Sequence, residues 1–328
     1  GSAVQSSAMT EVISTNLPGV PAWGIGLAIV IMVSVVIFGG VKVISNVCEK
    51  LVPFMAIAYI WGCVVILGMN WELVWPAFCL IVESAFTAKA AFGGALGSGL
   101  MLALQFGCAR GLFSNESGLG SAPIVASAAS TRNPARQALV SMTGTFLDTI
   151  VVCSMTGLAL VMTGAYQIPG LEGAAVTTAA FQAGLPFLPP EVVSFVLMAC
   201  LVLFGFTTIL GWDYYGERCL EYFSNGSMKA VKTYRWLYIA AVFIGPYMTV
   251  AAVWTIADIF NGLMALPNMI ALIALSGVVV KETKDYFERL QAAGDEDAME
   301  PHLPGDNWDI PPIDPLNAPD SDTAGARA

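Results

Sequence analysis

The chain has 328 residues, of which 56% are apolar and only 12% are charged. Soluble domains carry about 25% charged residues because water must solvate their surface. Together with a mean hydropathy of +0.72, this composition excludes a soluble enzyme, a nucleic-acid-binding protein and a disordered hub, and it predicts the lipid bilayer as the solvent. The formal net charge of −10 is concentrated from Lys281 onward, where twelve acidic residues face four basic ones. The acidity therefore describes a C-terminal tail and says nothing about a substrate.

Apolar runs of about 20 residues, the length that crosses a bilayer as a helix, recur along the chain. Seven such runs predict full spans at 23–44, 51–68, 93–113, 139–163, 192–210, 236–253 and 256–280. The shorter run 75–86 is interpreted as an interfacial or re-entrant helix. Residues 1–12 are interpreted as the end of an eighth, partial helix, so the chain is expected to be an N-terminally truncated fragment. The predicted fold is an all-α polytopic membrane protein.

The cationic residues gather in the connections on one side of this map. They are Lys42, Lys50, Arg132, Arg136, Arg218, Lys229, Lys232, Arg235, Lys281, Lys284 and Arg289, against Lys89 alone on the opposite side. Because short cytoplasmic loops carry the excess of Lys and Arg, this side is expected to be cytoplasmic. The predicted domains are a transmembrane domain at 1–280 and an acidic cytoplasmic tail at 281–328, which is expected to be disordered because it is rich in Pro and Asp.

The third predicted span combines glycine with polar side chains. Its glycines are Gly93, Gly94, Gly97, Gly99, Gly107 and Gly111, and its polar residues are Gln105, Arg110, Ser114, Asn115 and Glu116. Irregular backbone inside lipid is tolerated only where it is buried in protein or lines a cavity. Close helix packing through small residues is one explanation of the glycines. The polar residues favour the other, a broken helix near residues 93–115 of the kind that binds solutes in transporters.

Other polar residues lie within apolar spans. A carboxylate such as Asp148 costs roughly 2.5–3.5 kcal/mol at the centre of a bilayer, so it is either functional or a structural partner of Arg110. Thr207 and Thr208 are candidate sodium ligands, or they hydrogen-bond their own helix backbone. The segment 212–218 is typical of an interfacial belt, in which only Trp212 is deep enough to line a site. Asp258 and Asn261 are weaker candidates.

Motifs for enzymatic chemistry are missing from the sequence. It contains no Walker A motif, zinc motif or Ser/His/Asp set, and its single histidine, His302, lies in the predicted tail. The seven cysteines are scattered without a C-x-x-C pair, which favours small core residues over disulfides or metal ligands. We therefore expect neither an enzyme nor an organic cofactor.

The stretch Gly-Cys-Ala-Arg-Gly-Leu-Phe-Ser-Asn-Glu-Ser-Gly-Leu-Gly-Ser-Ala-Pro at 107–123 resembles the signature of the alanine or glycine:cation (sodium) symporter family. Further stretches at 49–55, 146–149, 206–218 and 257–266 are similar to the same family in the same order. The resemblance implies a five-plus-five inverted-repeat fold, in which Na⁺ drives the import of a small amino acid. It also implies a location in the plasma membrane, here the bacterial inner membrane. Ser117 departs from the family, which usually has Ala there.

The resemblance also implies roles for individual residues. Substrate contacts are expected from Gln5, Gln105, Phe106, Gly107 and Trp212, with residues 105–107 near the unwound middle of the broken helix. Sodium candidates are Thr207, Thr208, Asp148, Ser114 and Asn115. The family motif includes Arg110, Gly111, Asn115, Glu116 and Gly118.

The expected function is sodium-coupled symport of alanine or glycine by alternating access. Na⁺ is the coupling ion and the only metal, and the partners are the amino acid, Na⁺ and lipid, with no nucleic acid. Two other classes of function stay open at this point. One is a membrane scaffold or subunit that does not transport, and the weaker one is a membrane enzyme, for which the sequence contains no pair of nucleophile and base.

Overall fold

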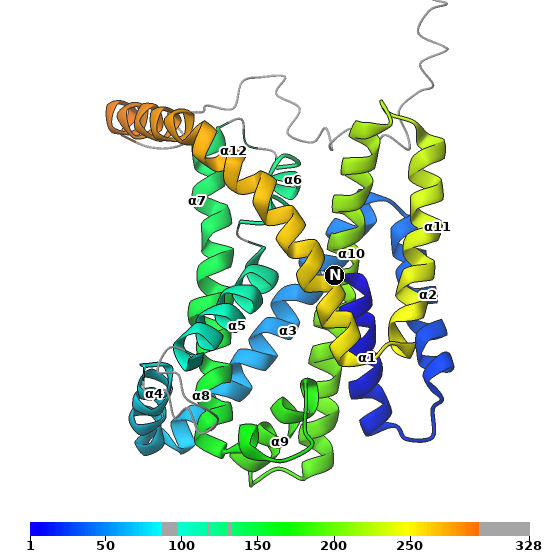
Figure 1. Cartoon of the computed structure of the whole chain (residues 1–328), viewed down its shortest axis with the longest axis vertical. Helices are drawn as coiled ribbons and strands as arrows, with labels where there is room; N and C mark the ends of the chain where they lie inside the picture. The colour runs from blue at the N-terminus through cyan, green and yellow to red at the C-terminus, as the bar shows by residue number, and fades with distance from the viewer. Residues whose placement is uncertain (87–97, 117, 130, 132, 295–328) are drawn as a thin grey trace, which may run out of the picture.

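The computed structural model describes residues 1–86, 98–116, 118–129, 131 and 133–294, and the regular elements of this part are all helical. The helices are α1 (Ser2–Asn16), α2 (Ala22–Phe38), α3 (Val41–Met69), α4 (Trp71–Phe86), α5 (Ser98–Asn115), α6 (Ala122–Ala126), α7 (Pro134–Thr145), the π-helix η1 (Phe146–Cys153), α8 (Ser154–Thr163), the 3₁₀ turn η2 (Ala165–Gln167), α9 (Ala174–Gly184), α10 (Pro190–Phe223), α11 (Met228–Ile244), the 3₁₀ turn η3 (Gly245–Tyr247) and α12 (Val250–Ala293). Figure 1 shows their arrangement.

Four stretches of helix are long and apolar enough to cross a bilayer. They are 43–69, 134–163, 190–223 and 250–292, and α2 is a shorter apolar helix. This confirms an all-α polytopic membrane protein. The count of seven spans and the inverted repeat stay predictions.

Two predicted spans have the wrong boundaries because a turn interrupts each of them. The run 23–44 is divided between α2 and α3 at Gly39 and Gly40, and Gly40 has φ 77°, a conformation that glycine adopts without steric cost. The run 236–253 is divided between α11 and α12 by the η3 turn. Thr249 is the N-cap of α12, and its hydroxyl accepts a hydrogen bond from the backbone N–H of Ala252 at 3.3 Å. The apolar run at 75–86 lies in a separate helix, α4, which begins earlier, at Trp71. Its interfacial or re-entrant position stays a prediction.

The predicted unwinding at residues 105–107 is wrong, since α5 is continuous from Ser98 to Asn115. Glycine costs only about 1 kcal/mol relative to alanine in a helix, and the Leu, Met, Ala, Gln and Arg residues of α5 favour helix. The glycines at 93–97 lie outside the described residues, so the break expected there is not described. A different irregularity replaces it: residues Phe146–Cys153 form a π-helix between α7 and α8. Such wide turns are frequent at functional sites.

Two apolar cores share α10. In one, α1, α2, α10 and α11 pack around Met9, Ile29, Ile209 and Val242, on the right in Figure 1. In the other, α3, α8 and α9 pack against the first half of α10. A third, smaller cluster joins α1 to α12, which crosses the molecule diagonally in Figure 1. These packings hold α10 at the centre of the fold.

The last helix is longer than the span predicted for it. α12 has 44 residues and continues through Lys281 to Ala293. Residues 281–293, which the predicted domain boundary assigned to a disordered tail, are therefore helical. The remainder of the predicted tail, 295–328, lies outside the described residues.

Candidate functional site

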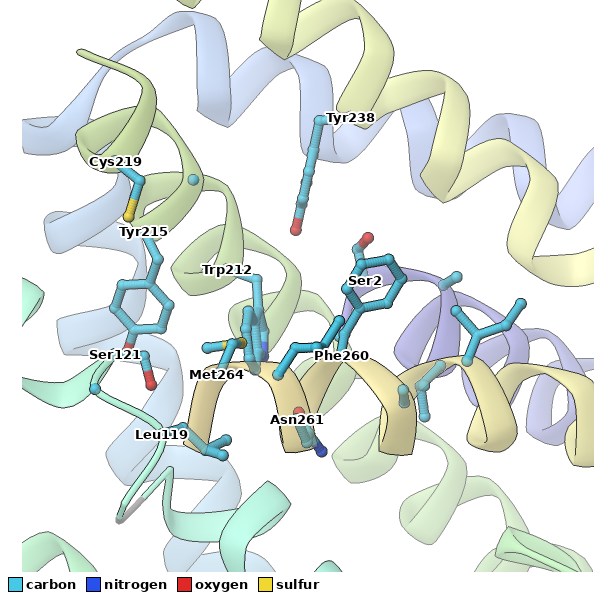
Figure 2. A pocket seen from close by; sticks show the side chains of 18 of the residues that line it. Ser2, Leu119, Ser121, Trp212, Tyr215, Cys219, Tyr238, Phe260, Asn261 and Met264 are labelled. Carbon is cyan, nitrogen blue, oxygen red and sulfur yellow. The ribbon is translucent and has the colours of Figure 1, made fainter. Parts of the chain in front are cut away.

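A cavity of about 690 Å³ lies between α1, α10, α11, α12 and the loop that follows α5. Figure 2 shows side chains from these elements around it. Its apolar walls include Trp212 and Phe260. Hydroxyl and amide groups of Ser121, Tyr215 and Asn261 also line it. Such a mixture of apolar walls and a few polar groups is typical of small-molecule sites.

Trp212 is the predicted substrate residue that the structure places in this cavity. Its ring is stacked near that of Phe113, with centroids 6.5 Å apart, and lies edge-on to that of Tyr215 at 5.7 Å. Aromatic neighbours of this kind restrict the side chain and fix the shape of the wall. The expectation that only Trp212 of the segment 212–218 is deep enough to line a site is wrong, because Tyr215 lines the same cavity. Asp213 and Glu217 are also buried, at 0% and 4% exposure.

The other predicted substrate residues do not line this cavity. Gln5 is half-buried in α1, next to residues 1–4, which do line it. Gln105, Phe106 and Gly107 are exposed on α5, because the continuous helix turns this face outward. The structure therefore brings Trp212 together with the loop after α5 and not with residues 105–107.

The end of the family motif shapes one wall of the cavity. Glu116 has φ 56° and Gly118 has φ 86°, and the second value favours glycine. The Glu116 carboxylate accepts hydrogen bonds from Ser121 Oγ at 2.9 Å and from the Tyr215 hydroxyl. Burial raises the pKa of Glu116 above its usual range, and these hydrogen bonds oppose the shift. Glu116 thus holds the loop against α10, with Leu119 and Ser121 in the cavity wall.

Arg110 joins α5 to α12. Its Nη2 atom lies 2.6 Å from Asp258 Oδ2, and its guanidinium lies 4.0 Å from the ring centre of Trp254. The predicted alternative of a salt bridge between Arg110 and Asp148 is wrong, because Asp258 is the carboxylate that pairs with Arg110. Neighbouring Gly111 is half-buried, and a Cβ at that position would have open space around it.

Three predicted sodium candidates meet at the π-helix. Ser114 Oγ donates to Asp148 Oδ2 at 2.6 Å, and Asn115 Nδ2 donates to Thr149 Oγ1 at 2.8 Å. Asp148 is half-buried there, and Ser114 is exposed. The wide turns of the π-helix present Asp148 and Thr149 side by side to the end of α5.

The other two sodium candidates lie on α10. Thr207 donates to the carbonyls of Leu203 and Phe204, both at 3.1 Å, and Thr208 donates to that of Phe204 at 2.8 Å. This is the backbone-bonded arrangement that was the alternative to a sodium site. Each hydroxyl oxygen still has lone pairs for a cation. Within the described residues there is no group of three or more His, Cys, Asp and Glu that would hold a transition metal.

A family model described as the sodium:alanine symporter family matches residues 1–300. The chain belongs to the sodium:alanine symporter family. It is 50% identical over 291 residues to an uncharacterized transporter of Haemophilus influenzae, with 89% of this chain and 62% of the relative covered. It is 45% identical to the sodium/alanine symporter AgcS of Methanococcus maripaludis, covering 88% and 62%, and 36% identical to the probable sodium/glutamine symporter GlnT of Bacillus subtilis, covering 87% and 59%.

Membership in the sodium:alanine symporter family confirms the resemblance carried by the motif at 107–123. The family is described as one of symporters, and four helices in the described part of this chain are long and apolar enough to cross a bilayer. The chain spans about three fifths of the length of the curated relatives it matches.

Proposed function

We propose that the protein performs sodium-coupled symport of a small neutral amino acid, alanine or glycine, by alternating access. The observation that carries this proposal is a cavity with an aromatic wall at Trp212, found in a chain of the sodium:alanine symporter family. Two of its relatives are named for sodium-coupled transport of alanine or glutamine. The proposed location is the bacterial inner membrane, with the C-terminal tail in the cytoplasm.

The amino acid is proposed to bind beside Trp212. The indole ring occupies volume that a longer side chain would need, and Phe260 faces the same space. The Asn261 amide nitrogen has no hydrogen-bond partner among the described residues and is proposed to donate to the substrate carboxylate. The hydroxyls of Ser121 and Tyr215 donate to Glu116, and their oxygens keep lone pairs for the substrate ammonium group. Gln5 and residues 105–107 stay part of the proposal only for a conformation in which they turn toward the cavity.

Sodium is proposed to bind hydroxyl and carboxylate oxygens, the ligands that hard cations prefer. One candidate set is Thr207 and Thr208 on α10, and the other is Asp148 with Ser114 and Asn115. Binding of Na⁺ and of the amino acid stabilise the same conformation, a coupling that is reciprocal by linkage. Inward movement of the ion gains about 2.3 kcal/mol per charge for each 100 mV of membrane potential.

Alternating access is proposed to occur by rocking of one five-helix repeat against the other around this site. The experiment that tests the function is uptake of labelled alanine by proteoliposomes containing the full-length protein. We expect uptake with an inward Na⁺ gradient and a large reduction when choline replaces Na⁺. Undiminished uptake in choline would reject sodium coupling, and no uptake of alanine, glycine or glutamine under either condition would favour a scaffold.

A further inference from the structure

Three charged side chains are buried between α10 and α11, outside the groups used by the proposed transport site. Asp213 is 0% exposed, and Glu217 and Arg235 are each 4% exposed. Arg235 was predicted to be a loop cation, but it lies in the core beside α10. Burying ionised groups is costly unless their charges are balanced. The balance of charge in this cluster therefore indicates which of its groups are ionised.

Glu217 and Arg235 already satisfy each other. Arg235 Nε contacts Glu217 Oε1, and Arg235 Nη2 donates to Glu217 Oε2 at 2.9 Å. This is the two-point geometry by which an arginine matches one carboxylate. The single positive charge of the cluster is therefore already matched by Glu217.

Asp213 lies one helical turn before Glu217, and neither of its carboxylate oxygens accepts a hydrogen bond from the residues that the structure describes. The charged groups that act on it are Glu217 of its own helix and Arg235 of α11. The titratable neighbours on α11 are Tyr234 and Tyr238.

The tyrosine hydroxyls have other positions. The Tyr238 hydroxyl donates a hydrogen bond to the carbonyl of Ile209 at 2.6 Å. It also interacts with the hydroxyl of Ser2 on α1. The Tyr234 hydroxyl occupies the place that a Cβ on residue 216 would take, so a larger residue there would force Tyr234 to move. An ionised Asp213 would thus be a second buried carboxylate that shares Arg235 with Glu217 and accepts no hydrogen bond from the residues that the structure describes.

A bound proton removes this imbalance. It neutralises Asp213 and can be shared with the carboxylate of Glu217, because residues four apart lie on the same face of a helix and Glu217 acts on Asp213. A metal cation suits the site less well, because hard cations need several oxygen ligands and Arg235 would repel one. We propose that Asp213 is a proton-binding site, with the proton held between its carboxyl group and that of Glu217.

The proton site lies next to the cavity. Trp212, Tyr215 and Gly216 line the cavity and flank Asp213 along α10, and Tyr234 and Tyr238 line it from α11. Any opening of the packing between α10 and α11 that let water in from this cavity would solvate Asp213 and favour loss of its proton. Protonation therefore favours the closed packing of α10 on α11, and the effect of pH on transport that follows rests on the proposed function.

Infrared spectroscopy of the purified full-length protein tests the proton site without any need for transport. We expect the C=O band of a protonated carboxyl group, which loses intensity as the pH is raised and is absent from Asp213→Asn. The matched control is Glu221→Gln on the same helix, which changes a carboxylate paired with Arg218 near the surface and should leave the band unchanged. A band of equal intensity in Asp213→Asn would overturn the proposal.

Thermal unfolding gives a second readout. Because ionisation of Asp213 is costly in the buried cluster, wild-type stability is expected to fall as the pH rises from mildly acidic to mildly alkaline. The fall should persist in Glu221→Gln and be lost in Asp213→Asn, which resembles the protonated carboxyl. If Asp213→Asn does not fold, the apolar variant Asp213→Leu takes its place in this measurement. If the stability of the Asp213 variant fell with rising pH as much as that of wild type, the proposal would be contradicted.

The transport measurement separates this proposal from the proposed function. Uptake of alanine at saturating Na⁺ should depend on pH in wild type and lose that dependence in Asp213→Asn. If the infrared band is present and no uptake is found, the proton site stands and the transport proposal fails. If uptake requires Na⁺ and no Asp213 band exists at any pH, the proton site fails and transport stands.

Discussion

Removal of the cation from the buried cluster should strongly destabilise the protein. Arg235→Gln leaves Glu217 and Asp213 buried without a positive charge, whereas the wild-type pair has two contacts and 5% side-chain exposure on each partner. Breaking a buried ion pair by removing one partner costs about 3–5 kcal/mol. We expect a loss of this size in the free energy of unfolding.

A nearby ion pair on the same helix supplies the control. Arg218 Nη1 lies 2.7 Å from Glu221 Oε2, and the two side chains are 26% and 25% exposed. A pair that stays partly open to solvent is screened and contributes little compared with a buried one, and Arg218 also lies over the ring of Tyr214. Arg218→Gln should therefore lower the free energy of unfolding by much less than Arg235→Gln.

The assay is denaturant unfolding of the purified protein in detergent, with the double variant Glu217→Gln/Arg235→Gln included. Because the double variant leaves no unmatched charge from the pair, it should recover a large part of the stability lost in Arg235→Gln. The reasoning would be refuted if Arg235→Gln and Arg218→Gln were equally mild. It would also be refuted if the double variant were as unstable as the sum of its single changes.

Further changes test the site. Trp212→Ala removes the indole from the cavity wall, and competition uptake assays should show relatively better transport of larger amino acids; an unchanged profile would remove Trp212 from the wall of the substrate site. Thr208→Val removes a hydroxyl oxygen, and Na⁺ titrations should show weaker activation with little change in melting temperature; equal Na⁺ affinity would exclude it as a ligand. Asp258→Asn weakens the ion pair between Arg110 and Asp258, whose side chains are 36% and 40% exposed. The free energy of unfolding, measured with denaturant, should fall by at most about 1 kcal/mol, and a larger loss would show that the pair is more than a surface contact. Burial raises the pKa of Glu116, so its contribution to stability is present at low pH and is lost as the pH rises through its folded-state pKa; Glu116→Gln should flatten this part of the melting-temperature profile, and an unchanged profile would contradict it.

Composition and apolar runs were enough to predict the class of fold. The long helices α3, α10 and α12 all contain predicted spans, because about 20 apolar residues suffice to identify a transmembrane helix. Their boundaries were harder to predict. Hydropathy continues across Gly39 and Gly40, so only the backbone conformation at Gly40 reveals that two helices meet there.

The candidate site was predicted in part. The family motif identified the segment that ends at the cavity, and the similar stretch 206–218 identified Trp212. The partner of Arg110 depends on tertiary packing of α5 against α12, which the spacing along the chain does not encode. The family resemblance placed unwinding at residues 105–107, where the continuous helix α5 tolerates Gly107. Asp213 was assigned to an interfacial belt because its neighbours are aromatic and charged, and burial by α11 is visible only in three dimensions.

Equilibrium binding of labelled alanine to the purified full-length protein, measured across a titration of Na⁺, tests the coupling between solute and ion most directly. We predict that Na⁺ raises the affinity for alanine and that alanine raises the affinity for Na⁺ by the same factor, as linkage requires. An alanine affinity that is the same in Na⁺ and in choline would contradict a sodium-coupled carrier.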